Sequence, residues 1–220
     1  MDERFMEARK RISEPGPVIT ISRECGCAGR EFAEKLTDRI NSQIINPAHK
    51  WKWVSKEILQ LASEELRIDR SQIKDLINAN EKSFFDDFVH SFTDKNYIHE
   101  GKIRKAIEEV VRNIAIEGKA VIVGRGSEAL TEDIPQSLKI KLFAPLKWKI
   151  SAISECKKIS IDKAKRVVIE TDAQREKFRE KYLTKNRESH NYDLELNCSK
   201  FTQEEMIELI LKIARIKSFI

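Results

Sequence analysis

Residues 18–31 read VITISRECGCAGRE, and this stretch decides the fold. The first four residues are apolar or β-branched, which predicts a short buried strand. The next eight contain two glycines and predict a loop. A helix is expected from Arg30 onward, because apolar residues then recur at helical spacing, at Phe32, Ala33, Leu36 and Ile40. A strand, a glycine loop and a helix in this order are typical of a phosphate-binding loop, where backbone N–H groups and the positive end of the helix face one anion.

Strand and helix patterns alternate along the rest of the chain. Further strands are predicted at 119–124, 138–144 and 192–197. The helical segments expected are a lead-in at 1–16, a long stretch at 55–117, a helix opened by Pro145, a charged segment at 160–187 and a C-terminal helix. Capping-box spacing marks helix starts at Thr171 and Thr202. Strands separated by helices predict an α/β fold of three layers, with a parallel sheet covered on both faces, in a single domain over 1–220.

The composition narrows the class of protein. The 220 residues are 40% hydrophobic and 35% charged, with a formal net charge of +5, a mild excess that suits a polyanionic ligand. No block of like charges indicates nucleic-acid binding, and no apolar stretch is long enough for a membrane span. The start of the chain lacks the apolar region of a signal peptide. Cys25 and Cys27 are too close for an unstrained disulfide, so we expect reduced thiols and a cytoplasmic protein.

The loop departs from the usual phosphate-binding pattern G-x-x-x-x-G-K-[ST]. Gly29 matches the second glycine, but Glu24 stands at the first, Arg30 at the lysine and Glu31 at the hydroxyl. An arginine keeps the positive charge in a planar fork that differs from an ammonium. The nucleotide-binding candidates are Cys25, Gly26, Cys27, Ala28, Gly29, Arg30 and Glu31. The alternative is an ordinary strand-to-helix turn whose glycines serve only its geometry.

Two further groups of residues are candidates for ligand binding. Asp172, Arg175, Glu176 and Arg179 share one helical face. This face is either a solvated set of ion pairs or a lid that brings arginines to a transferred phosphoryl group. Arg125 follows a predicted strand within Gly124-Arg125-Gly126, where ligands of open α/β sheets bind; otherwise it is an arginine at the edge of the core that pairs with a carboxylate.

Several motifs together resemble the cytidylate kinase-like family, a divergent branch of the P-loop nucleoside-monophosphate kinases. The resemblance spans residues 18–216 and rests on ITISRE at 19–24, Gly26, GRE at 29–31, AEKL at 33–36, VGRG at 123–126, KLFAP at 141–145, Asp172 with Arg175, and YDL at 192–194 with Asn197. It implies ATP over 26–31, Mg²⁺ bridging the phosphates, and a lid at 160–187. By the same resemblance, Arg30, Arg175 and Arg179 act in catalysis.

The resemblance also implies an acceptor. A nucleoside monophosphate, cytidylate, would lie under 55–117 and contact Arg125 and Asp172. The classical bacterial cytidylate kinases, however, carry Gly-Arg-Asp where this chain reads Gly124-Arg125-Gly126, so a glycine replaces their aspartate. An aspartate that the family usually has near Ser55 is also missing. We therefore predict an ATP-dependent nucleoside-monophosphate kinase. The alternative is a P-loop protein that binds a nucleotide or phosphate without turnover. A third hypothesis is an interaction protein whose loop binds nothing.

The remaining expectations concern metals and partners. The four histidines are scattered, and no Cys/His cluster completes a metal site, so no protein-bound metal is predicted. The partners expected are nucleotide substrates, with neither nucleic acid nor membrane. A homodimer is left open.

Overall fold

The computed structural model describes residues 15–55, 58, 61, 100–180 and 192–220. Three predicted segments lie wholly or partly outside the described residues. They are the lead-in before residue 15, the part of the helical stretch from 56 to 99 apart from residues 58 and 61, and the end of the charged segment at 181–187.

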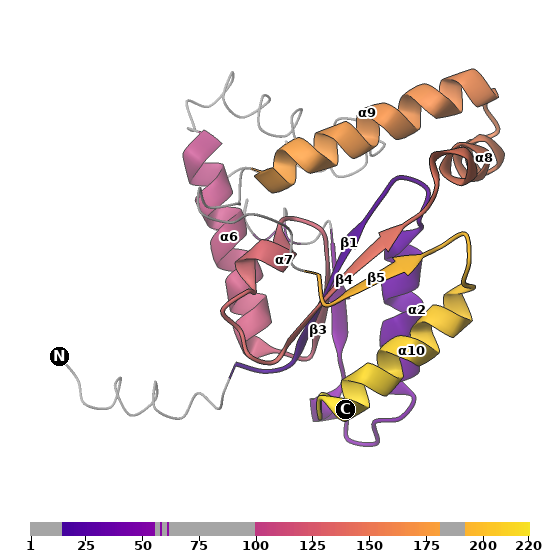
Figure 1. The fold of residues 1–220 in the computed structure, drawn as a ribbon. Coiled ribbons are helices and arrows are strands. Elements are labelled where there is room, and N and C mark those ends of the chain that lie inside the picture. Colours follow the sequence, from indigo (N-terminus) through magenta and orange to yellow (C-terminus); the bar gives the residue numbers. More distant parts are fainter. Residues whose placement is uncertain (1–14, 56–57, 59–60, 62–99, 181–191) are drawn as a thin grey trace, which may run out of the picture.

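A parallel sheet of five strands forms the centre of the described structure (Figure 1). Its strands are β1 (Val18–Arg23), β2 (Lys52–Val54), β3 (Ala120–Val123), β4 (Ser137–Phe143) and β5 (Leu194–Asn197), in the order β2-β3-β1-β4-β5. β1 pairs with β3 on one side and β4 on the other. The strand order reverses beside β1, so the loop after β1 leaves the sheet where open α/β sheets bind their ligands.

Helices cover both faces of the sheet and one of its edges (Figure 1). Helices α2 (Gly29–Asn41) and α10 (Gln203–Ile216) pack on one face, and α6 (Glu100–Glu117) packs on the other, beside the short α7 (Ser127–Leu130). Helices α8 (Leu146–Lys157) and α9 (Ile161–Glu180) form a hairpin over the ends of the strands, and a 3₁₀ turn, η1, spans Pro47–His49. The predicted three-layer α/β fold is confirmed.

The side chains of β1 alternate between the two faces of the sheet. Ile19 and Ile21 lie in the cluster that contains the α2 residue Phe32, whereas Val18 lies in the cluster that contains the α6 residue Ile107. The three β1 side chains named here, and Phe32 and Ile107 of the helices, are fully buried. Alternation with period two therefore places β1 between two apolar layers, as its continuous apolar sequence predicts.

Strand β2 was not predicted. It is only three residues long, and its first residue, Lys52, is exposed, so it carries no apolar run. Trp51, directly before it, is 5% exposed and lies in the main core cluster. A pairing register with β3, rather than a local sequence pattern, makes this segment a strand.

The predicted helix start at Thr171 is wrong, whereas the one at Thr202 is confirmed. Thr171 lies inside the continuous helix α9 and is 6% exposed, so it packs as an interior residue and caps nothing. The break in this region comes earlier, at Lys158, which ends α8 with a left-handed φ of 50°. At α10, Thr202 and Glu205 exchange both hydrogen bonds of a capping box.

Within the described part of the chain, every helix is too short or too polar to cross a bilayer.

Gly118, between α6 and β3, lies where the backbone closely approaches that of Gly16. Its φ is +78°, and a Cβ built there would lie 2.4 Å from the Cα of Gly16. We expect Gly118→Ala to lower the free energy of unfolding by at least about 1–3 kcal/mol, the typical strain of a non-glycine residue in an unfavourable backbone conformation. Urea denaturation measures this change. Glu117→Ala, which removes only an exposed ion pair with Lys52, is the control; an equal loss in both variants would contradict the prediction.

Candidate phosphate-loop site

The loop between β1 and α2 has the backbone geometry of an anion-binding turn. Gly26 has a φ of +87°, and Ala28, which precedes α2, is left-handed with a φ of 43°. The N–H of Cys27 donates to the carbonyl of Glu24 (3.2 Å), which closes the turn. No side chain caps the start of α2, so its positive end faces the loop. Glu24 has no positive φ, and this loop therefore does not require glycine at that position.

Arg23, the last residue of β1, links the loop to the end of β3. A Cβ at Gly29 would lie 2.8 Å from its Cγ, and a Cβ at Gly124 would lie 2.2 Å from its Nη1. The side chain thus extends from the start of α2 to the turn after β3. Both glycines leave room for this arginine, which gives a physical reason for two of the glycines in the motifs.

The α8–α9 hairpin packs directly on the loop. The side chain of Cys25 is 5% exposed and lies in an apolar cluster with residues of both helices, namely Ile150, Ile153, Ala164, Val167 and Val168. A Cβ at Gly26 would lie 3.4 Å from the carbonyl oxygen of Lys149. Burial is also the main reason why the pKa of the Cys25 thiol is raised. The loop is therefore held from one side by α2 and from the other by the hairpin.

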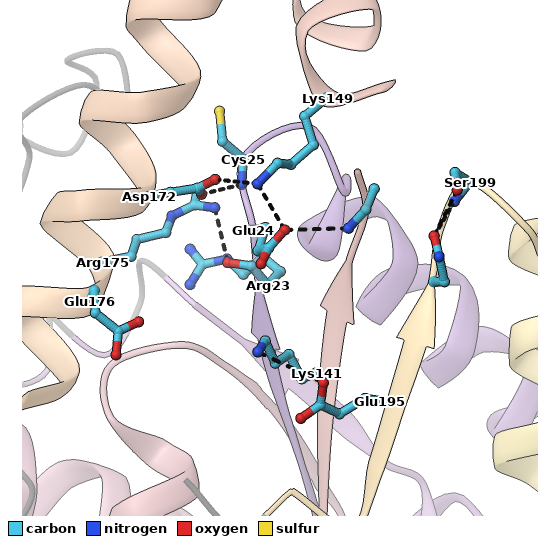
Figure 2. A network of polar contacts seen from close by, with 12 residues as sticks. Arg23, Glu24, Cys25, Lys141, Lys149, Asp172, Arg175, Glu176, Glu195 and Ser199 are labelled. Carbon is cyan, nitrogen blue, oxygen red and sulfur yellow. Dashed lines mark hydrogen bonds and ion pairs between the residues drawn. The ribbon is translucent and has the colours of Figure 1, made fainter. Parts of the chain in front are cut away.

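An ammonium shared by two carboxylates lies where the hairpin meets the loop (Figure 2). Lys149 Nζ donates to Glu24 Oε2 (2.8 Å) and to Asp172 Oδ2 (2.7 Å). The other oxygen of Asp172, Oδ1, accepts the backbone N–H of Cys25 (2.6 Å). Desolvation lowers the pKa of Lys149, but the hydrogen bonds to Asp172 and Glu24 outweigh it, so the pKa lies above its ordinary value and the ammonium stays charged.

The arginines of α9 contact the end of β1. Arg175 Nη1 donates to the carbonyl of Arg23 (3.1 Å), and Arg179 Nη1 donates to Ser22 Oγ (3.2 Å) and Tyr192 Oη (3.1 Å). Arg179 also forms an ion pair with Glu176. Successive turns of α9 therefore lie along the exit of β1, and the face that carries Asp172, Arg175 and Arg179 is turned to the loop.

The remaining candidates lie around the loop. Arg30 is half-buried at the start of α2, and its Nε is buried without a hydrogen-bond partner among the described residues. Glu31 is exposed and pairs with Lys35 (2.9 Å) on the outer side of α2. Arg125 is half-buried, with a left-handed φ of 63°, in the turn between β3 and α7. Arg30 and Arg125 thus follow the ends of two neighbouring strands.

Sequence reasoning did not select Lys149 or the side chain of Arg23 as site residues. Lys149 is one of three lysines in α8, and neither its spacing nor its neighbours distinguish it from the exposed Lys147. Only the folding of α8 over the loop buries it. The one signal available for Arg23 was its place in the motif ITISRE, directly after the buried strand.

The described residues contain no group of three or more histidine, cysteine or carboxylate side chains that could hold a metal ion. They do fit a polyphosphate. A loop N–H already binds a carboxylate oxygen, and a buried ammonium lies beside it. Arg30, which directly follows the loop, has a buried Nε without a hydrogen-bond partner among the described residues. The arrangement can therefore bind an anion with several oxygens.

A second pair of interacting groups lies under the loop. The thiol of Cys27, 4% exposed, hydrogen-bonds to that of Cys198, which follows β5 and is half-buried. This bond raises the pKa of Cys27, with burial adding to the effect. It lowers the pKa of Cys198, although burial opposes it. Of the two thiols, Cys198 therefore loses its proton at the lower pH.

Solved structures share the fold of the described residues, and one of them is a kinase. Among solved structures, a shikimate kinase from Bacteroides thetaiotaomicron aligns with a TM-score of 0.50 at 9% identity, over 90% of this chain and 98% of that one. An uncharacterized protein from Eubacterium ventriosum aligns with a TM-score of 0.63 at 22% identity, over 90% and 97%. At these identities the likeness concerns the fold.

The sequence family is more specific. The profile of the cytidylate kinase-like family matches residues 18–200, which is most of the chain, and the protein belongs to this family. The resemblance inferred from the motifs is thereby confirmed. A search of curated proteins found no match.

The thiol pair generates a prediction about reactivity. The thiolate reacts with iodoacetamide, so the alkylation rate of Cys198 should rise with pH at lower values than for an ordinary thiol. In Cys27→Ala the hydrogen bond that lowers the pKa of Cys198 is removed, and its alkylation midpoint should move to higher pH. Peptide mass spectrometry of alkylated samples measures this midpoint. The exposed Cys156 on α8 is the internal control, and an unchanged midpoint for Cys198 would refute the interaction.

Proposed function

We propose that this protein transfers the γ-phosphoryl group of ATP to a nucleoside monophosphate, and that the acceptor is cytidylate. The observation that carries the proposal is the contact between the phosphate loop and the arginine-bearing face of α9. Membership of the cytidylate kinase-like family supports a kinase-like activity. The resemblance of the chain's motifs to that family suggests cytidylate as the acceptor. The proposal also treats the protein as cytoplasmic, in keeping with its four free thiols.

The donor phosphates would lie over the loop from Cys25 to Glu31. Backbone N–H groups and the start of α2 would bind their oxygens, and Arg30 would supply a positive charge from the first turn of that helix. Mg²⁺ would be held chiefly by the phosphates and would neutralise their charge. Glu31, whose carboxylate pairs with Lys35 on the outer side of α2, is less well placed than the loop N–H groups to contact a phosphate.

The acceptor would lie beside the ends of β3 and β1. Arg125 would contact its phosphate, and the helical stretch at 55–117, of which α6 is described, would cover it. Arg175 and Arg179, on the face of α9 that is turned to the loop, would neutralise charge on the transferred group. Little covalent chemistry is needed, because phosphoryl transfer depends mainly on positioning and charge.

One observation favours a second function, the binding of a nucleotide without turnover. Glu31, at the position of the usual magnesium-binding hydroxyl, is exposed and engaged by Lys35. Thermal melting with ATP–Mg²⁺ and with CMP distinguishes a binder from a non-binder, and a coupled ADP-release assay then distinguishes the kinase from the binding protein. ADP release that depends on CMP supports the kinase. If ATP stabilises the protein but no nucleoside monophosphate tested gives ADP release, the second function would replace the kinase proposal.

Arg30 should contribute to binding of the triphosphate. We expect Arg30→Ala to weaken ATP binding by roughly 1.5–3 kcal/mol, the typical loss of a charged hydrogen bond, and to leave nucleoside binding nearly unchanged. Isothermal titration calorimetry measures both affinities. Arg39→Ala is the control, since Arg39 lies on the same helix but pairs with Glu208 at the exposed end. Equal ATP affinity in Arg30→Ala and in the parent would show that Arg30 does not contact the phosphates.

Arg175 should act on the rate. A lid arginine stabilises the transition state more than the ground state, so Arg175→Ala should lower kcat with CMP by at least about tenfold while changing KM less. Steady-state kinetics, with a melting curve of the same protein, measure the effect. Lys177→Ala, at an exposed position of the same helix, should leave the kinetics unaltered. Parental kinetics in Arg175→Ala would show that its contact with the Arg23 carbonyl is purely structural.

A further inference from the structure

Asp172 binds the phosphate loop in the manner of a ligand. One of its oxygens accepts the N–H of Cys25 and the other accepts an N–H of the Lys149 ammonium, at 2.6 and 2.7 Å. A backbone N–H and an ammonium that hold two oxygens of one anion are the means by which a phosphate-binding loop holds a phosphate. The side chain is 23% exposed, so this carboxylate belongs to the closed interface between α9 and the loop (Figure 2).

Charged side chains from several elements meet at this interface, among them Arg175 of α9, which donates to the carbonyl of Arg23. Two carboxylates, Glu24 and Asp172, share the single ammonium of Lys149, whose side chain is only 10% exposed. Like charges in such surroundings repel more strongly than in water. A phosphate that approached the N–H of Cys25 with Asp172 in place would add further negative charge within contact distance. Asp172 and a ligand phosphate are therefore mutually exclusive at this N–H.

We propose that Asp172 is an internal substitute for a ligand phosphate at the loop, and that Lys149 supplies the phosphate-binding ammonium that the loop sequence lacks. Lys149 comes from α8, which packs against Gly26, so its ammonium lies beside the loop although it is far from it in sequence. Binding of a polyphosphate displaces Asp172 and leaves Lys149 between Glu24 and the phosphate. The inference rests on the proposed nucleotide site and assigns Asp172 to the donor side of it.

The test compares the parent protein with Asp172→Asn. The amide keeps the size of the side chain but removes its charge, and it leaves Lys149 paired with Glu24, so the variant should fold. We expect Asp172→Asn to bind tripolyphosphate at least about tenfold more tightly than the parent, the scale of one charge-assisted hydrogen bond. Calorimetric titration with tripolyphosphate in the absence of magnesium measures this affinity. Asp162→Asn, at an exposed position of the same helix, should bind like the parent.

The part played by Lys149 is tested on the same background. Adding Lys149→Gln to Asp172→Asn avoids leaving two unpaired carboxylates and should abolish the gain in affinity. Lys147→Gln on that background, an exposed position of α8, should keep the gain. A double variant that still binds as tightly as Asp172→Asn would show that Lys149 does not contact the phosphate.

The outcomes distinguish this inference from the proposed function. Equal or weaker binding of tripolyphosphate by Asp172→Asn would overturn the inference, even if the parent phosphorylates CMP. Tighter binding would support it, even if neither protein transfers a phosphoryl group, and the kinase proposal alone would then fail. Binding by the variant where the parent shows none would also support it, because an internal anion that blocks the loop predicts that result.

Discussion

Pairing of β1 on both sides positions the rest of the structure. The strand is buried between β3 and β4, and its backbone hydrogen bonds run into both neighbours. The end of β1 therefore lies in the middle of the row of strand ends. The loop that follows is surrounded by the end of β3, the start of α2 and the α8–α9 hairpin. The candidate residues come from the loop or from one of these elements, and the side chain of Glu31 alone among them lies on the outer side of α2.

Electrostatics at the loop explain one departure from the usual phosphate-binding sequence, the glutamate at position 24. Glu24 occupies a position that needs no positive φ, and its carboxylate accepts from Lys149 and from the N–H of Ala144. A glutamate there connects the loop to the segment between β4 and α8. The lysine missing from the loop has a counterpart in space, since the ammonium of Lys149 lies at the same loop. Glu24 and Lys149 thus belong to one connected arrangement, whereas Glu31 pairs with Lys35 on the outer side of α2.

The hairpin joins the loop through apolar and polar contacts of different kinds. Cys25 inserts its side chain among aliphatic residues of α8 and α9, while its N–H binds Asp172. The apolar contact tolerates small shifts, because burial of apolar surface is non-directional. The hydrogen bond and the ion pairs depend on direction and on charge, and they respond to an anionic ligand. The same contact surface can therefore hold the hairpin near the loop while its charged groups exchange partners.

The sequence by itself determined the strand–loop–helix unit, four of the five strands, the confirmed capping box at Thr202 and the family. Local periodicity and turn chemistry decide these features. It did not determine β2, which is a strand because β3 pairs with it, or the continuity of α9 through Thr171, which burial stabilises. The tertiary structure alone decided that Asp172 and Lys149 meet at the N–H of Cys25. These three residues are remote in sequence, and the contact depends on how α8 and α9 pack on the loop, which no local pattern encodes.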